Sequence, residues 1–168
     1  VDLKDVYTSN NNPAPTGTLT VNKEVTGATA PSGTTYYVVL SSGTGSNIVY
    51  YNANGTTATS ASAAARAITA GGSIEYTGLD TSKTYTVTET NSSGEAISAT
   101  NTPAAINGYT WTETGSNLSA EVATGAWSST TTPTATATIT NNYEQDTTPT
   151  GKFTLTKTID AENLTESE

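Results

Sequence analysis

The chain has 168 residues, a formal net charge of -9 and no cysteine, methionine or histidine. This length suits one domain of ordinary size, and the composition excludes disulfides, thiolate nucleophiles, cysteine zinc sites and the commonest general base of enzymes. Six basic residues against 15 acidic ones leave no cationic track for a nucleic acid, and no apolar run approaches the roughly 18 residues of a membrane span.

Threonine, which favours pleated strands, occupies close to a quarter of the positions. Alternating apolar and polar residues predict strands at 18–25, 35–41, 47–52, 73–78, 84–90, 109–114, 118–123 and 134–143. Gly-containing turn signals separate them, and one further turn is predicted at 78–80. The Ala-rich segment 59–68 fits either a helical turn or an outer strand. This pattern of short strands predicts an all-β fold, an immunoglobulin-like β-sandwich.

Two partial repeats suggest a segment of a tandem array. GTLTVNKEVTG at 17–27 aligns with GKFTLTKTIDA at 151–161, and VDLKDVY at 1–7 aligns with ATITNNY at 137–143. Short linkers join these repeats to the central part of the chain, and both linkers contain proline. Because proline limits their flexibility, the array is expected to be semi-rigid. We therefore expect three parts: the last strand of a preceding domain plus linker at 1–12, a complete domain at 13–147, and a linker with the first strand of a following domain at 148–168.

Three polar residues fall in phase with the apolar stripes of predicted strands. Lys23 lies in the stripe of the first strand, Glu89 in that of the 84–90 strand, and Asn141 in that of the last. Each side chain on its own could lie near a strand end and reach water. Burying one unpaired charge costs several kcal/mol, so three such residues in a weakly charged domain are expected to meet.

Their meeting would allow a covalent reaction. A lysine amine is nucleophilic only when unprotonated, and an apolar core disfavours its charged form. The same burial favours a neutral Glu89, which could donate a hydrogen bond to the Asn141 carbonyl and shuttle the proton. Lys23 would then attack the side-chain carbon of Asn141 and expel ammonia. The product would be an isopeptide crosslink, formed once per molecule rather than by turnover.

The segments VNKEV, YTGLDTSKTYTVTET and ATITNNY, in this order, resemble the B-type domains of Gram-positive collagen adhesins (Cna B-type) and the related pilin domains. The resemblance implies a self-generated isopeptide bond between Lys23 and Asn141, with Glu89 as the assisting acid. Asn142 is the other candidate acceptor, although it is out of phase with the stripe. By the same resemblance, Asp5 and Lys157 are the corresponding residues of the preceding and following domains.

The resemblance implies a structural repeat of an adhesin stalk or pilus shaft on the bacterial cell surface. Its partners would be neighbouring repeats or pilin subunits, with no cofactor, no nucleic acid and no enzymatic turnover. The alternative is an adhesive binding module for a host matrix protein or glycan, for which six aromatic residues could form a platform: Tyr36, Tyr37, Tyr50, Tyr51, Trp111 and Trp127. Asp80, Glu144 and Asp146 lie near turns, but their spacing is not that of a calcium loop, and no metal is expected.

Overall fold

The computed structural model describes residues 15–128, 131–147 and 154–156. Within these ranges the chain is almost entirely β-structure, with one helix of four residues and two short 3-10 turns. The helix, α1, spans Ala61–Ala64. The strands are β1 (Thr16–Thr26), β2 (Thr35–Ser42), β3 (Val49–Tyr51), β4 (Thr57–Ala58), β5 (Arg66–Thr69), β6 (Ser73–Asp80), β7 (Tyr85–Thr90), β8 (Tyr109–Asn117), β9 (Ser119–Val122) and β10 (Thr134–Gln145).

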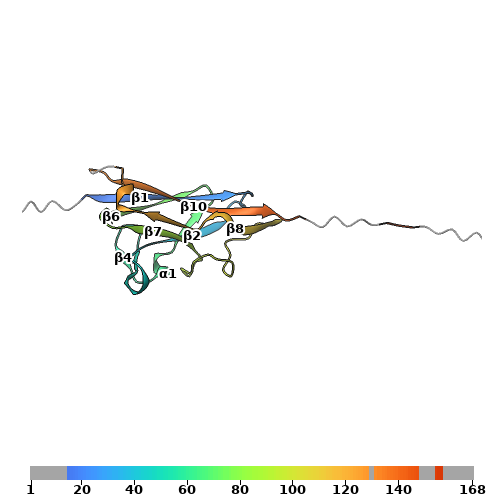
Figure 1. Ribbon diagram of the computed structural model, residues 1–168, viewed down its shortest axis with the longest axis horizontal. Helices are drawn as coiled ribbons and strands as arrows, with labels where there is room; N and C mark the ends of the chain where they lie inside the picture. The colour runs from blue at the N-terminus through green and yellow to red at the C-terminus, as the bar shows by residue number, and fades with distance from the viewer. Residues whose placement is uncertain (1–14, 129–130, 148–153, 157–168) are drawn as a thin grey trace, which may run out of the picture.

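The strands form two sheets that pack face to face as a sandwich (Figure 1). One sheet has the order β6-β1-β10-β8. The other has the order β4-β3-β2-β7-β9, and β5 also pairs with β2. The inward faces of both sheets supply one apolar core, in which Leu19, Val38, Tyr76, Val87 and Ile139 are all fully buried. The predicted all-β immunoglobulin-like sandwich is confirmed.

The first and last strands of the domain lie side by side and run in the same direction. β1 pairs with β10 in parallel over nine residue pairs, from Thr18 with Thr134 to Thr26 with Asn142. In Figure 1 both strands point the same way, so the start of β1 and the end of β10 lie at opposite ends of the sandwich. The strand by which the chain enters the domain and the strand by which it leaves are therefore in direct contact along most of their length.

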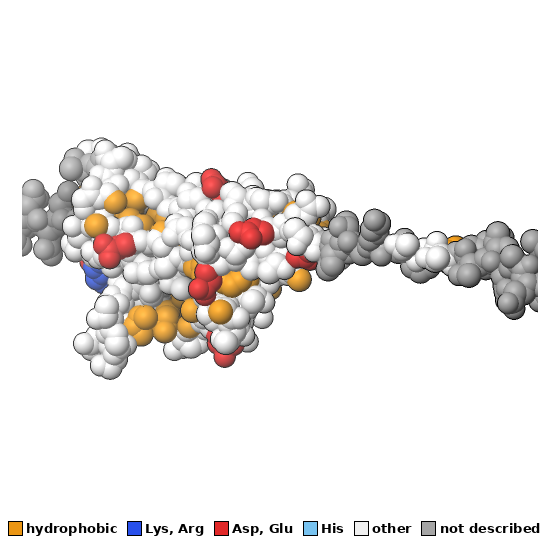
Figure 2. Space-filling model, turned by 45° about the vertical axis from the view of Figure 1, so that its right-hand side comes forward, with side chains coloured by type: hydrophobic (Ala, Val, Ile, Leu, Met, Phe, Trp, Pro, Cys, Tyr) orange, Lys and Arg blue, Asp and Glu red, His pale blue; other side chains and the backbone are white. Residues whose placement is uncertain are grey.

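The strand alternation explains why threonine can be so abundant. Along β10 the residues from Ala135 to Tyr143 alternate between buried and less buried positions, and most of the outward ones are threonine. Figure 2 shows that charged side chains are few and scattered on the face in view. On this face, uncharged side chains and the backbone therefore cover most of the surface.

The observed strands follow the predicted ones closely, except that the two-residue strand β4 was not predicted and that two other segments differ. The turn predicted at 78–80 is wrong, because β6 continues to Asp80. Gly78 has a φ of 70° there, and the pairing of β6 with β1 shifts register beside it, so the glycine marks an irregularity within a strand rather than its end. The Ala-rich segment 59–68 contains both of the alternatives considered, since α1 and the start of β5 lie within it.

Several expectations concern residues outside this description. Asp5 and Lys157 lie outside the described residues, as does most of the segments 1–12 and 148–168. The division into three parts therefore stays a prediction. No helix among the described residues is long and apolar enough to cross a membrane.

Two buried tyrosines make the stability of this core sensitive to alkaline pH. Burial raises the pKa of Tyr76 and of Tyr85 to about 12, whereas an unfolded chain has tyrosines that titrate near about 10. The unfolded chain therefore loses these protons first, and we expect the free energy of unfolding to fall as the pH rises from about 10 to about 12. Denaturant unfolding across this range measures the effect.

Tyr76→Phe and Tyr85→Phe form a matched pair for this test. The Tyr76 hydroxyl has no hydrogen-bond partner among the described residues, so its removal should weaken the alkaline loss and leave stability at neutral pH unchanged or higher. The Tyr85 hydroxyl donates to the backbone oxygen of Asp80 at 3.1 Å, and its removal should cost about 1 kcal/mol at neutral pH. An alkaline loss that persists unchanged in both variants would contradict the assignment.

Candidate functional site

The candidate site consists of three polar side chains from three strands, all inside the sandwich. Lys23 lies on β1 and Asn141 on β10, in one sheet, and Glu89 lies on β7 of the other sheet. Their exposed fractions are 1%, 0% and 1%, in a core that is otherwise almost entirely apolar. The structure thus brings together the three residues that the strand phases singled out.

The parallel register sets the positions of the amine and the carboxamide. Lys23 is paired with Ile139, and Asn141 is paired with Val25. Asn141 therefore lies one inward-facing position further along the sheet than the backbone partner of Lys23. The long lysine side chain can span this diagonal, whereas a register slip of one residue would turn one of the two side chains to the opposite face.

Glu89 makes a hydrogen bond to each of the other two residues. Its Oε2 accepts from Lys23 Nζ at 3.0 Å, and its Oε1 accepts from Asn141 Nδ2 at 2.8 Å. The amine and the carboxamide are therefore held side by side by the two oxygens of one carboxylate. Asn141 Oδ1 is buried and makes no hydrogen bond with any described residue.

The burial of Lys23 shifts its protonation equilibrium toward the uncharged amine. Burial lowers the pKa of the Lys23 ammonium below its ordinary value, and the adjacent Glu89 carboxylate opposes this shift in part. Moving one proton from Lys23 to Glu89 would leave both groups uncharged. If the Asn141 amide then turned over, a protonated Glu89 could donate to the carbonyl oxygen that now lacks a donor.

An aromatic side chain covers the amine. The Tyr36 ring lies on β2, with its centroid 4.7 Å from Lys23 Nζ. Burial raises the pKa of the Tyr36 hydroxyl, and also that of Tyr143, to which the nearby Tyr36 hydroxyl contributes. Tyr143 donates to the backbone oxygen of Ala104 at 2.6 Å. These two tyrosines therefore link the candidate site to the segment that follows β7.

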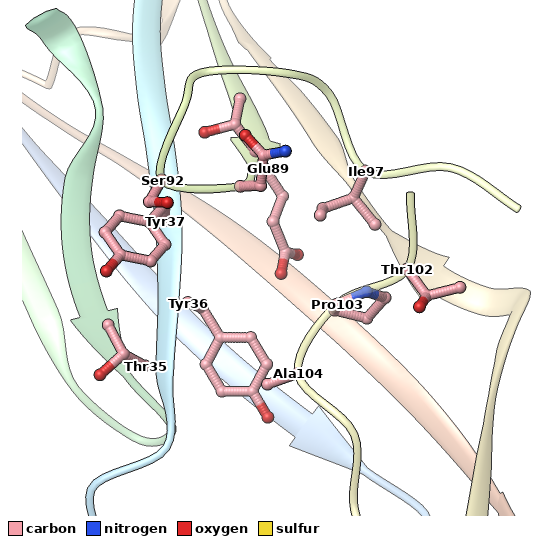
Figure 3. Close-up of a pocket in the computed structure, with 11 residues that line it drawn as sticks. Thr35, Tyr36, Tyr37, Glu89, Ser92, Ile97, Thr102, Pro103 and Ala104 are labelled. Carbon is pink, nitrogen blue, oxygen red and sulfur yellow. The ribbon is translucent and has the colours of Figure 1, made fainter. Parts of the chain in front are cut away.

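The segment after β7 folds over Glu89 and leaves a small pocket beside it. The Ile97 backbone N–H donates to the Glu89 carbonyl at 3.0 Å. The pocket has a volume of about 210 Å³ and lies between this segment and β2. Figure 3 shows the Glu89 side chain pointing between Tyr36 and Pro103. Glu89 thus lines this pocket although its side chain is almost completely buried.

Sequence reasoning missed the contribution of Tyr36 and of this covering segment. The signal for Tyr36 was present, because it is in phase with the buried Val38 and Leu40 of β2. Its inclusion in a sugar-binding platform was therefore inconsistent with its own strand pattern. The path of residues 91–104 carried no comparable signal, since it contains only isolated bridges and turns.

The structure does not assemble the other candidate sites. Asn142 faces away from Lys23, where its Oδ1 accepts from Thr26 Oγ1 at 2.8 Å and its Nδ2 donates to the Thr114 carbonyl at 3.1 Å. Tyr36 and Tyr51 are buried, and Trp127 packs against the core, so these aromatic residues do not share an exposed face. Across the described ranges, no group of three or more acidic residues is placed to hold a metal ion.

The chain belongs to a domain family, which a family model identifies. The family model described as "Domain of unknown function (DUF5979)" matches residues 19–144, which is most of the chain and nearly all of the sandwich. This description does not name the collagen-adhesin B-type domains, so that closer resemblance stays a prediction. No curated protein matches the chain significantly.

Several solved structures of bacterial surface proteins are similar to the chain. A pilus 2b backbone protein of group B streptococcus is 26% identical, with a TM-score of 0.46 over 82% of this chain and 47% of that one. A Mobiluncus mulieris adhesin containing intramolecular disulfide, isopeptide and ester crosslinks is 16% identical, with a TM-score of 0.39 over 78% and 42%. The pilus-presented adhesin Cpa is 16% identical, with a TM-score of 0.36 over 79% and 28%. The chain spans less than half the length of each.

Glu89 and Lys23 form a buried pair. We therefore expect a large difference in stability between variants that remove one partner of this pair and variants that replace both. All comparisons carry Asn141→Ala, so that no covalent bond can form. Glu89→Ala leaves the Lys23 amine without a partner, and we expect a loss of about 3–5 kcal/mol in the free energy of unfolding. Lys23→Met combined with Glu89→Gln replaces the pair with uncharged groups of similar size and should cost much less. Denaturant unfolding checks both, and equal losses would contradict a buried ion pair.

Proposed function

We propose that the domain is a structural module that crosslinks itself through an isopeptide bond between Lys23 and Asn141, with Glu89 as the acid that assists. The observation that carries the proposal is the sharing of one buried carboxylate by the amine and the carboxamide, at 3.0 Å and 2.8 Å. Groups held in contact inside a folded core react as if they were present at very high concentration. Folding itself would therefore supply most of the rate.

The proposed reaction balances without any added reagent. Lys23 transfers a proton to Glu89, and the free amine attacks the Asn141 side-chain carbon while Glu89 donates to its oxygen. The proton lost by the attacking nitrogen passes through Glu89 to the departing amide nitrogen. The amide nitrogen leaves as ammonium, which carries away the proton that Lys23 first gave to Glu89. The bond from Nζ to Cγ remains, and Glu89 returns to its carboxylate form. The low pKa that burial imposes on Lys23 favours the first of these steps.

The position of this bond suits a domain that bears tension. Force applied at the start of β1 and the end of β10 would enter one strand at Thr16 and leave the other at Gln145. A bond between Lys23 and Asn141 would carry that force directly and bypass the roughly 120 residues between them. Chain-entropy arguments for a loop of this length give a stabilisation of about 5 kcal/mol.

A repeat in a stalk or pilus shaft on the bacterial cell surface is the role that these properties suit best. The partial repeats at both ends of the sequence and the proline-containing linkers support an array of similar domains, which would be the main partners. In that array Lys157 and Asp5 would take the roles of Lys23 and Asn141 in the neighbouring domains. Recognition of a host protein or glycan gains no support from the buried and packed aromatic residues.

Intact mass and a tryptic digest test the bond directly. The folded chain should be lighter than its sequence by about 17 Da, the mass of one ammonia. Acylated Lys23 resists trypsin, so the denatured digest should contain a branched product that joins residues 5–66 to residues 84–152. Lys23→Ala, Asn141→Ala and Glu89→Ala should each retain the full mass and give only linear peptides.

The three variants separate the roles of the residues. Full mass in the unaltered chain, or a branched product that persists in Asn141→Ala, would refute the assignment of the two bonded residues. A branched product that forms at the normal rate in Glu89→Ala would leave the bond standing but remove the acid from the mechanism.

Single-molecule pulling from the two ends tests the mechanical role. Lys23→Ala should unfold in a step of roughly 400 Å, because about 130 residues extended at 3.3–3.6 Å each span somewhat more than this and the length of the folded domain is subtracted. The unaltered chain should show no such step at forces that unfold the variant, since the bond removes the shear path between β1 and β10. A full-length step in the crosslinked chain would exclude this role.

A further inference from the structure

Two Asn-Gly dipeptides occur in the described part of the chain, at Asn54-Gly55 and Asn107-Gly108, and the structure treats them very differently. In such a pair the glycine backbone nitrogen can approach the asparagine side-chain carbon, because glycine has no Cβ to obstruct it. The two sites therefore share the same local chemistry. Any difference between their reactivities must come from the fold.

The fold restrains both reacting groups of Asn54-Gly55, the asparagine side chain and the glycine N–H. Asn54 Oδ1 accepts hydrogen bonds from Thr56 N at 3.2 Å and from Thr56 Oγ1 at 2.7 Å. The Gly55 N–H donates to the Asn52 carbonyl at 3.0 Å. A Cβ on Gly55 would lie only 2.6 Å from the backbone oxygens of Thr77 and Gly78, so the turn is also closely packed. The side chain and the backbone nitrogen would both have to leave their partners to react.

At Asn107-Gly108 the fold leaves the two reacting groups without such hydrogen bonds. Both residues are exposed and form the centre of a turn closed by the bond from Tyr109 N to the Ile106 carbonyl at 3.1 Å. No hydrogen bond between described residues involves the Asn107 side chain or the Gly108 N–H. A Cβ on Gly108 would meet nothing within 4 Å. The electrophilic carbon and the nucleophilic nitrogen are thus adjacent and exposed, and neither group has to leave a hydrogen-bond partner among the described residues before they react.

We propose that Asn107 is a site of spontaneous covalent modification and that Asn54 is protected. The Gly108 backbone nitrogen gives up its proton and bonds to the side-chain carbon of Asn107, and the amide nitrogen leaves with a proton as ammonia. Water then opens the resulting succinimide ring. Attack at one ring carbonyl yields aspartate, and attack at the other yields isoaspartate, in which the main chain runs through one additional methylene.

The modification would affect the end of β10, where the chain leaves the domain. The Gly108 carbonyl accepts from Asp146 N at 2.9 Å, and Asp146 Oδ1 accepts from Thr110 Oγ1 at 2.7 Å. Tyr109 pairs with Gln145 at the end of β10. An additional methylene in this turn would disturb the bond that anchors Asp146, and either product would add a negative charge there. The connection between β10 and the segment that follows it would therefore loosen as the protein ages.

Incubation of the full chain at mildly alkaline pH tests the proposal, followed by a tryptic digest in which fragment-ion sequencing assigns the modified residue within each product. We expect a gain of about 1 Da and isoaspartate at Asn107, at a rate about tenfold or more above that at Asn54, since two or three hydrogen bonds must break at the latter. The same chain in denaturant should lose this preference and modify both sites at similar rates. Equal rates in the folded chain, or the same preference in denaturant, would overturn the inference.

Asn107→Ala is the matched control. It should abolish the gain in mass while leaving the unfolding midpoint of fresh protein unchanged, because the Asn107 side chain makes no hydrogen bond with a described residue. This result is independent of the proposed crosslink, which does not involve residue 107. The succinimide also lacks one ammonia, so Asn107→Ala is the appropriate background in which to assign a loss of that mass to Lys23 and Asn141.

Discussion

One buried carboxylate holds the two sheets in a fixed relation. Glu89 is almost completely excluded from solvent and would cost several kcal/mol if it had no partner. Its donors, Lys23 and Asn141, come from the opposite sheet, so the polar contact exists only when the sandwich is closed and in register. The apolar residues around them supply most of the burial, but they would tolerate small shifts. The hydrogen bonds of Glu89 specify one alignment.

The parallel pairing of β1 with β10 determines how the domain would respond to tension applied at its two ends. In an antiparallel arrangement both ends of the domain would lie together, and tension would peel the strands apart one bond at a time. Here the strands overlap in parallel and their free ends lie at opposite ends of the sandwich, so tension loads the whole ladder in shear. A covalent bond within that ladder would protect the fold where a chain without cysteine has no disulfide to do so.

Three asparagine side chains illustrate how the fold decides the reactivity of one chemical group. Asn141 lies in the dry interior beside an amine, with an acid in contact with both. Asn107 lies in an exposed turn beside an unrestrained backbone nitrogen, and Asn54 has the same neighbour but is restrained by Thr56. The intrinsic electrophilicity of the carboxamide is the same in all three. Access to a nucleophile and freedom to approach it are what differ.

The alternation of residues in the chain was sufficient to predict most strands, their inward faces and the identity of the three buried polar residues, because a period of two along a strand is a local property. It misjudged the end of β6, where a glycine continues a strand instead of ending it. Three features emerge only in the folded chain: β1 lies parallel to β10, Glu89 bonds to both partners across the sandwich, and Tyr36 and residues 91–104 cover them. These depend on which strands pair and on how a loop folds back, and such long-range choices leave no periodic trace in the chain.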